Sequence, residues 1–393
     1  MVVSLSDKNH KSFSVLRIVW EFPPKIGGSV THISELSRKI DPFLQKQIIF
    51  APYIEGCEAF DKTFPIQVIR QKIPKFCDFG VPIIQNMFYS FYVIKTVLQI
   101  IKDNNINIIH FHSPILASYF IPHIRAYDKH VKIFVMAHGW PGKKDERFGI
   151  SYYFGNKLIP LFPPNKYFIL NDGSQICELQ SILNKKNIPW DIVYHGIDTD
   201  LFKPAENSIS SNSFNVLFPH RPIPIKRPDI AMNIFKKFLN RINDYSVSLL
   251  YLSASQSEEL IELARKEGIE NNVQFLNELS GDELINCINN SSVVIGTSMN
   301  SNNGRAIQEA MACEKPVIVF DNNGNMSNLI ENMENGILID SGNIDDFVES
   351  LVLLYNKPDL RLKMGRNARK TIIEKRSWEK RIKKELSIYQ KTV

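Results

Sequence analysis

Short runs of apolar, often β-branched residues alternate with helical patterns along nearly the whole chain, and this alternation constrains the fold most. Strands separated by helices form parallel sheets that are covered on both faces. The alternation runs through the first half and restarts near Asn215. With 393 residues, the chain is long enough for two domains. The fold class expected is therefore α/β, with two Rossmann-like domains.

Strand and helix positions follow from the same pattern. The predicted strands of the first half are Val15–Trp20, Gln47–Ala51, Ile66–Ile69, Ile108–His112, Lys132–Ala137, Tyr167–Leu170 and Ile192–His195. Those of the second half are Asn215–Pro219, Val247–Leu252, Val273–Leu276, Val293–Gly296, Val317–Phe320 and Gly336–Ile339. Helices are predicted between them, for example over Asp229–Arg241, Gln256–Glu267 and Gly281–Asn289.

A polar Ser/Asn run places the domain boundary. The N-terminal domain is predicted over residues 1–195, a linker over 196–213 and the C-terminal domain over 214–377. The last helix is predicted to begin at Trp378. It forms the final segment, 378–393, which is expected to pack back on the first domain.

Composition suits a globular protein, with 44% hydrophobic residues and a formal net charge of +6. That modest excess, without a basic stripe, argues against nucleic-acid binding. The five cysteines are scattered and form no Cys-x-x-Cys pair, so we expect reduced thiols in a cytoplasmic protein. The N-terminus lacks a signal-peptide core, and Val81–Ile101 is too polar to span a membrane.

The segment Asn300–Asp321 carries the clearest indication of a binding site. It reads as a polar loop, a helix and a buried strand. A loop that leaves a parallel strand and opens a helix presents backbone N–H groups and the positive end of the helix dipole, which suits an anion such as a nucleotide pyrophosphate. Glu309 is expected beside the buried face of the helix, where it can accept hydrogen bonds from ribose hydroxyls.

Two cations follow the first strand of the second half. Arg221 and Lys226 suit a diphosphate leaving group, since Arg can bind it in a fork and Lys acts as a point charge. A solvated surface pair is the alternative.

Two features of the first half are weaker. Gly27 and Gly28 lie in a strand-to-helix turn and permit close approach of a phosphate or sugar, although an ordinary turn explains them equally well. His138 ends an apolar strand and can donate to a sugar hydroxyl. A core or loop histidine with satisfied hydrogen bonds is the alternative.

Other groups are open to more than one interpretation. His110 and His112 are possible metal ligands, but no third ligand is evident. Asp198–Thr199–Asp200 looks like an Asp-x-Asp metal motif, but it lies at the start of the linker and not after a core strand of the first domain. The aromatic, lysine-bearing stretch Lys72–Ile101 suits either a lipid headgroup layer or a helix packed on the first sheet. No Ser–His–Asp or Cys–His set and no Walker loop is evident.

Taken together the motifs resemble the retaining, nucleotide-sugar-dependent glycosyltransferases of the GT-B fold (glycosyl transferases group 1, glycosyltransferase family 4-like). The resemblance covers nearly the whole chain. It is carried by FPPKIGGSVTHISELS, IIHFHSP, FVMAHGW, HGIDTDLFKP, HRPIPIK, NNGRAIQEAMACEKPVIV and SWEKRIKKELSIY. It implies parallel sheets that face one another across a cleft.

The resemblance also implies roles for single residues. Arg221 and Lys226 would hold the donor pyrophosphate, His138 would touch the donor sugar, Glu309 would bind the ribose, and Gly28 would lie against the diphosphate. The remaining donor-binding residues expected are Gly27, Ser301, Asn302, Asn303, Gly304 and Arg305. No metal and no cofactor is required, because the cationic side chains and the helix dipole neutralise the diphosphate.

The chain departs from the family pattern at three positions. Ser301 stands where an acid is usual, Asn328 stands where a second acid is usual, and His220 replaces the glycine before the phosphate-binding arginine. The lost acid at Ser301 places the identity of the donor sugar in doubt.

The function expected is transfer of a hexosyl or N-acetylhexosaminyl group from a UDP- or GDP-sugar to a glycan, polysaccharide or lipid-linked acceptor. The reaction would retain configuration by front-side attack, at the cytoplasmic side with peripheral membrane contact. The alternatives are another GT-B enzyme, a phosphorylase or epimerase, and a non-catalytic nucleotide-sugar-binding partner of another transferase.

Overall fold

The computed structural model describes residues 12–25, 27–74, 82–138, 162–170, 176–205, 213–244, 246–254, 257–279, 281–298, 304–321 and 326–392. The chain divides into two compact units. The first unit takes the chain up to Asn171, Gln175–Gly196 and, from the far end of the sequence, Arg381–Val393. The second unit is formed mainly by Ile197–Lys380.

The first unit is built on a parallel sheet. Its described strands form a seven-stranded sheet in the order β3-β2-β1-β4-β5-β6-β7, and each neighbouring pair is parallel. They are β1 (Ser14–Ile18), β2 (Lys46–Pro52), β3 (Gln67–Gln71), β4 (Ile108–Phe111), β5 (Lys132–His138), β6 (Lys166–Leu170) and β7 (Trp190–Val193). The strand order changes direction between β1 and β4, which makes their carboxyl ends the switch point of this sheet.

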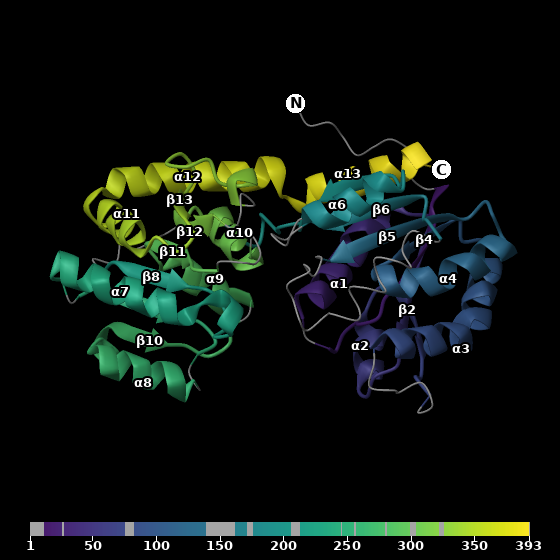
Figure 1. Ribbon diagram of the computed structural model, residues 1–393, viewed down its shortest axis with the longest axis horizontal. Helices are drawn as coiled ribbons and strands as arrows, with labels where there is room; N and C mark the ends of the chain where they lie inside the picture. Colours follow the sequence, from purple (N-terminus) through teal and green to yellow (C-terminus); the bar gives the residue numbers. More distant parts are fainter. Residues whose placement is uncertain are drawn as a thin grey trace. The chain divides into compact units, whose positions relative to one another are not determined.

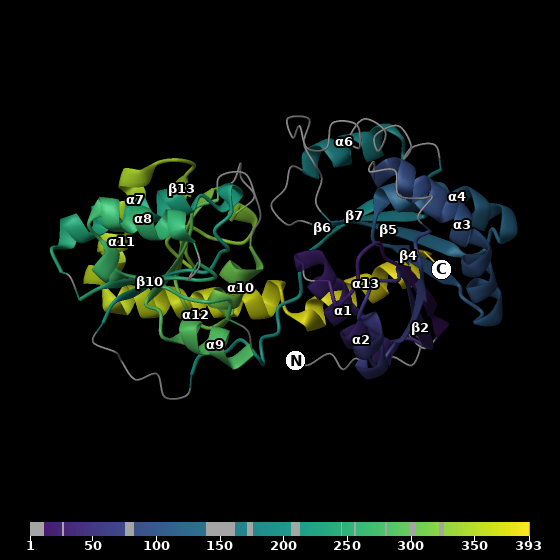
Figure 2. The ribbon, with the colours of Figure 1, turned by 90° about the horizontal axis from the view of Figure 1, so that it is seen from below.

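Helices cover both faces of the first sheet (Figures 1 and 2). One face packs on Tyr89 and Val97 of α3 and on Phe120 of α4. The opposite face packs on Leu386 and Tyr389 of α13. The helices are α1 (Gly28–Ile40), α2 (Cys57–Thr63), α3 (Pro82–Asp103), α4 (Pro114–Tyr127), α6 (Ile176–Lys185) and α13 (Trp378–Thr392), with the 3-10 turn η2 (Asp41–Phe43).

The second unit repeats the plan. Its described strands form a parallel sheet of six in the order β10-β9-β8-β11-β12-β13, the usual doubly wound order. They are β8 (Asn215–Phe218), β9 (Ser248–Tyr251), β10 (Val273–Phe275), β11 (Val293–Gly296), β12 (Val317–Asp321) and β13 (Ile337–Asp340). The switch point of this sheet lies between β8 and β11.

Successive residues of these strands alternate between two apolar layers. Phe218 and Ile295 face one layer with α7, α8 and α11, whereas Leu217 and Val294 face the other with α10 and α12. The helices are α7 (Pro228–Ile242), α8 (Glu258–Glu267), α9 (Gly281–Asn289), α10 (Arg305–Ala312), α11 (Ile344–Asn356) and α12 (Pro358–Lys375), with the 3-10 turns η5 (Pro224–Lys226), η6 (Glu270–Asn272) and η7 (Met326–Asn328).

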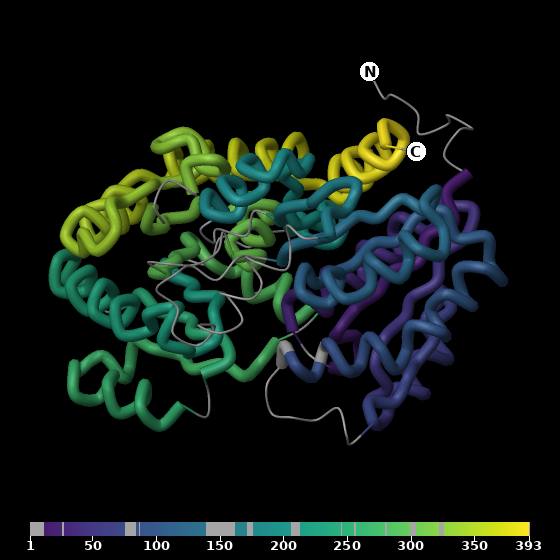
Figure 3. The backbone as a smooth tube through the Cα atoms, turned by 45° about the vertical axis from the view of Figure 1, so that its right-hand side comes forward, coloured from purple at the N-terminus to yellow at the C-terminus, as the bar shows by residue number. Residues whose placement is uncertain are grey.

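Each predicted strand coincides with an observed one, with ends shifted by at most two residues. The predicted α/β class with two parallel-sheet domains is thereby confirmed. The C-terminal segment, yellow in Figure 3, lies beside the blue and teal segments of the first unit, to which it belongs from Arg381 onward.

Helix α3 has two distinct faces. Tyr89, Val93 and Val97 are buried against the first sheet, as the packed-helix interpretation requires. Phe91 and Tyr92 nevertheless expose 54% and 47% of their surface. Within the described residues, no helix combines the length and apolar character needed to cross a bilayer.

Candidate functional site

The carboxyl ends of β8 and β11 define the candidate site of the second unit, because open α/β sheets bind ligands at the switch point. The loop after β8 carries both predicted cations. It is held against the end of β11 by Thr297, whose Oγ1 lies 2.9 Å from the carbonyl oxygens of both Lys226 and Arg227. Thr297 is fully buried. The backbone of the cationic loop is thus fixed to the neighbouring strand.

The two cations differ in exposure. Arg221 is exposed, and Lys226 is half-buried at the end of η5. Arg227, which follows, adopts a left-handed backbone with φ of 50° and forms an ion pair with Asp229 at 2.8 Å. Asp229 therefore neutralises Arg227 within the protein, and Arg221 and Lys226 are the two predicted cations of this loop.

Helix α10 opens directly beside this edge. Gly304 is its N-cap residue and forms no side-chain cap, so the first backbone N–H groups carry the positive end of the helix dipole. The expected donor-binding residues Ser301, Asn302 and Asn303 lie outside the described residues. Gly304 and Arg305 lie at the start of the helix, as expected.

Glu309 is more buried than the sequence suggested. The prediction placed it beside the apolar face of α10, but it exposes only 7% of its surface. Its Oε1 accepts a hydrogen bond from Arg305 Nε at 2.7 Å. Burial with a cationic partner one turn away explains the difference, because the pair can leave water together. The carboxylate is consequently held in one orientation, near the site rather than out in solvent.

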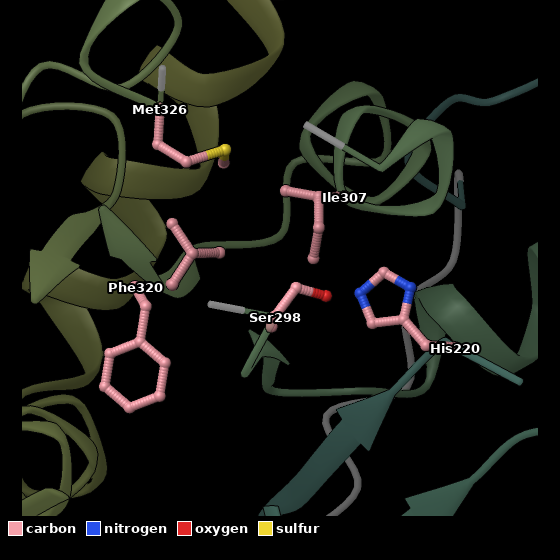
Figure 4. A pocket seen from close by; sticks show the side chains of 7 residues that line it. His220, Ser298, Ile307, Phe320 and Met326 are labelled. Atoms are coloured by element: carbon pink, nitrogen blue, oxygen red, sulfur yellow. The ribbon is translucent and has the colours of Figure 1, made fainter. Parts of the chain in front are cut away.

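A small cavity of about 10 Å³, room for about one water, lies at the switch point (Figure 4). The His220 ring and the Ser298 side chain are both directed into it. Ser298 Oγ is buried and has no hydrogen-bond partner among the described residues. A side chain at Gly296 would lie 3.6 Å from His220 Nε2 and only 3.2 Å from Val319 Cγ1, so the absence of a side chain keeps the strand end close to its neighbours. The cavity is lined by His220, Gly296, Ser298, Ile307, Val319, Phe320 and Met326.

Burial, assisted by the charge of Lys226, lowers the pKa of His220 to about 3. The neutral imidazole of His220 and the Ser298 hydroxyl, which has no partner among the described residues, are additional candidate contacts for a ligand. Sequence reasoning noticed His220 only as a departure from the family and missed Ser298. The position of Ser298, two residues after a strand at the predicted switch point, was the available indication.

The first unit places its predicted residues at the carboxyl edge of its own sheet. Gly27 and Gly28 open α1, and the Gly27 carbonyl accepts a hydrogen bond from the Thr31 N–H at 2.9 Å. A side chain at Gly28 would meet nothing within 4 Å, so packing of the protein does not demand glycine there. His138 is the last residue of β5, and its Nε2 lies 3.1 Å from Nδ1 of His112.

The structure also bears on the residues that the sequence raised as possible metal ligands. Within the part of the chain that the structure describes, no three His, Cys, Asp or Glu side chains are grouped to hold a metal ion. Asp198 Oδ1 accepts hydrogen bonds from the backbone N–H groups of Asp200 and Leu201 at 3.3 and 3.1 Å. This carboxylate therefore stabilises a turn.

Comparison with known proteins identifies sequences and structures that are similar to this chain. Residues 201–371 match the family model described as glycosyl transferases group 1. A poly(ribitol-phosphate) alpha-N-acetylglucosaminyltransferase of Staphylococcus aureus is 28% identical over 43% of this chain and 34% of that protein. An uncharacterized glycosyltransferase of Methanocaldococcus jannaschii is 23% identical over 94% of this chain and 96% of that protein. Several other curated relatives are matched over only about half of their length.

Among solved structures, HepE of Anabaena in complex with UDP aligns with a TM-score of 0.76 at 16% identity, covering 97% of this chain and 100% of that one. The class that fold and site define is thus an α/β protein of the GT-B type, with two parallel-sheet domains. The chain resembles the group 1 glycosyltransferases, and residues 201–371 carry the match to that family. The family resemblance seen in the sequence is confirmed.

Proposed function

We propose that the chain transfers a hexosyl or N-acetylhexosaminyl group from a nucleotide-diphosphate sugar to a glycan or lipid-linked acceptor, with retention of configuration. The observation that carries this proposal is the switch point of the second unit. There Arg221 and Lys226 follow β8, and the N-terminus of α10, which begins after Gly304, follows β11. Both features suit a diphosphate.

The cations and the helix dipole stabilise the leaving diphosphate as its charge develops. Arg221 offers a planar fork of donors, and Lys226 offers a compact positive charge. Because Thr297 holds the backbone of the cationic loop in place before the reaction, less reorganisation is needed in the transition state. In this proposal they make a metal ion unnecessary.

Front-side attack accounts for retention without a covalent intermediate. The bond between the anomeric carbon and the leaving phosphate oxygen breaks, and the acceptor oxygen forms its bond on the same face. The acceptor proton passes to the departing phosphate oxygen. The protein then contributes positioning, charge stabilisation and exclusion of water.

Glu309 is proposed to accept hydrogen bonds from the ribose hydroxyls of the donor. Its ion pair with Arg305 at 2.7 Å orients the carboxylate, whose oxygens can only accept hydrogen bonds, as a ribose hydroxyl requires. Gly27, Gly28 and His138, which the resemblance assigns to the diphosphate and donor sugar, are proposed as the contribution of the first unit.

The nucleotide is proposed to be UDP in preference to GDP. The comparison structures of HepE were solved with UDP and with UDP-glucose. The Staphylococcus aureus relative is named for transfer of N-acetylglucosamine to a poly(ribitol-phosphate), which supports a polymeric acceptor. Titration of the full chain with UDP and then GDP, followed by a donor-hydrolysis screen, tests the choice.

A membrane-bound acceptor would be reached through α3. Phe88, Phe91 and Tyr92 expose 38%, 54% and 47% of their surface, and Lys95 and Lys102 on the same helix are also exposed. Aromatic side chains flanked by cations suit an anionic lipid surface. Binding of the full chain to vesicles with and without anionic lipid, compared between wild type and Phe91→Ser, tests this contact at the cytoplasmic face.

Lys226→Ala is the sharpest test of the proposed transfer. Loss of one fixed cation at the leaving group is expected to lower turnover by about 10²-fold or more. Lys266→Ala, an exposed lysine at the end of α8, is the matched control and should retain turnover. Equal activity of the Lys226 variant and the control would remove Lys226 from the diphosphate site.

A second candidate function is a non-catalytic nucleotide-sugar-binding partner of another transferase. Asn328 in η7 favours it, because a carboxylate is usual in the family at that position. Nucleotide binding without turnover, across a panel of donors and acceptors, would favour this alternative.

A further inference from the structure

A chain of buried polar side chains runs through the first unit toward His138. It begins at Arg17 near the end of β1, and the side chain of Arg17 is fully buried. Arg17 NH1 lies 3.3 Å from Nε2 of His112. His112 Nδ1 lies 3.1 Å from Nε2 of His138. Arg17, His112 and His138 are thus connected in sequence through the two ring nitrogens of His112.

Arg17 is held in place on its other sides. Its Nε donates to Gln47 Oε1 at 2.6 Å, and its NH2 donates to Glu385 Oε1 at 2.8 Å. Glu385 lies on α13, 368 residues after Arg17 in the sequence. Its carboxylate also contacts Arg381 NH2 at 2.6 Å and the Tyr389 hydroxyl at 2.7 Å. The guanidinium therefore has little freedom to turn away from His112.

The donor and acceptor roles along this chain follow from chemistry. A guanidinium can only donate hydrogen bonds, so Nε2 of His112 must accept. A neutral imidazole carries a single N–H, which places the hydrogen of His112 on Nδ1. That N–H donates to Nε2 of His138. The hydrogen of His138 is therefore on Nδ1.

We infer that Arg17 is a positioning residue that, through His112, fixes His138 in the Nδ1–H tautomer and makes it a hydrogen-bond donor toward its ligand. Nε2 of His138 is occupied as an acceptor, so the ring cannot use that nitrogen as a base. The inference rests on the proposed function only in assigning the donor sugar as the partner of the Nδ1–H group.

The surroundings of His112 and His138 keep both rings neutral. Burial lowers the pKa of His112 well below its ordinary value, and electrostatic interactions with His110 and Arg17 act in the same direction. Burial and the neighbouring His195 lower the pKa of His138 to about 3. Imidazolium forms, which would donate from both nitrogens, are thus disfavoured near pH 7.

The tautomer can be measured directly on the full chain with ¹⁵N-labelled histidine, without donor or acceptor. Long-range ¹H–¹⁵N correlations distinguish Nδ1–H from Nε2–H, and a His138→Gln variant identifies the signals. The wild type is expected to show His138 neutral and predominantly Nδ1–H. Arg17→Met should populate both tautomers of His138. In that variant Glu385 still forms its ion pair with Arg381, so the buried carboxylate keeps a cationic partner. Turnover at saturating donor should fall about five-fold, the factor for one neutral hydrogen bond.

Tyr389→Phe is the matched control, since it removes a hydroxyl from the same buried network but keeps the contact between Arg17 and His112. It should retain the wild-type tautomer. His112→Phe interrupts the chain directly, and should also mix the tautomers if Arg17→Met does not fold.

A wild-type His138 that is charged or predominantly Nε2–H at pH 7 overturns the inference. So does a folded Arg17→Met or His112→Phe variant with an unchanged tautomer. If the tautomers behave as expected but no sugar is transferred, the proposed function fails while the positioning by Arg17 stands.

Discussion

Acid should destabilise the first unit well before its carboxylates are protonated. His110, His112 and His138 are all held neutral in the folded unit, with burial the largest cause. The pKa of His110 is lowered to about 4 and that of His138 to about 3, and the pKa of His112 also lies well below its ordinary value. As the pH falls through the unfolded value of about 6.5, the unfolded chain binds protons first. The free energy of unfolding must then decrease.

The magnitude follows from the displacement of these pKa values. Between pH 7.5 and pH 5.5, one histidine that stays neutral when folded but titrates near 6.5 when unfolded contributes a loss of about 1.4 kcal/mol. Three such residues give about 4 kcal/mol. That is a large share of the roughly 5–15 kcal/mol that stabilises a typical domain. The loss stops growing only once the pH falls to the folded values.

Urea denaturation of the full chain at pH 7.5 and pH 5.5, followed by circular dichroism, measures this loss. His112→Phe removes one of the three groups, so its fall should be about 1.4 kcal/mol smaller than that of the wild type. His130→Gln removes an exposed histidine of the same unit and is the control. A wild-type fall below about 1 kcal/mol, or an equal fall in the His112 variant, would refute the reasoning that these rings are buried neutral.

Three further outcomes are expected. Glu309→Ala should weaken nucleotide binding by about 1–3 kcal/mol in calorimetric titration, and an unchanged affinity would remove this carboxylate from the ribose site. Glu385→Ala should lower the free energy of unfolding by about 3–5 kcal/mol because it leaves Arg17 buried without its carboxylate; a loss under about 1 kcal/mol would contradict the pairing. Gly365→Ala should lower the melting temperature, since the new Cβ would lie 2.0 Å from the Glu314 carbonyl oxygen; an unchanged melting temperature would mean that α12 moves aside without loss.

The central strands could be predicted because their residues are buried on both faces. Val317–Asp321, for example, is almost entirely buried, and its run of β-branched and aromatic residues is visible in the sequence. The same holds for Ile108–Phe111. Helix α10 followed from the spacing of Ile307, Ala310 and Met311, which all lie in the buried layer.

The residues of the candidate site could be predicted only where they follow a recognisable strand or helix in the sequence. Arg221 and Lys226 follow a recognisable strand, and so their place at its carboxyl end was predictable. The burial of Glu309 depends on Arg305 and on the layer beneath α10, which periodicity alone does not resolve. The pairing of Arg17 with Glu385 joins positions 368 residues apart. No local pattern specifies a contact of that kind.

The buried pairing of Arg17 with Glu385 has a consequence for biosynthesis. During translation β1 leaves the ribosome early, but the carboxylate for its arginine is made only when synthesis reaches α13. Until then one face of the first sheet lacks Leu386 and Tyr389, and a buried cation lacks its counter-ion. The first unit is therefore expected to reach its native packing after the second unit has been synthesised, and nascent chains that stall before residue 385 should remain sensitive to protease in their N-terminal half.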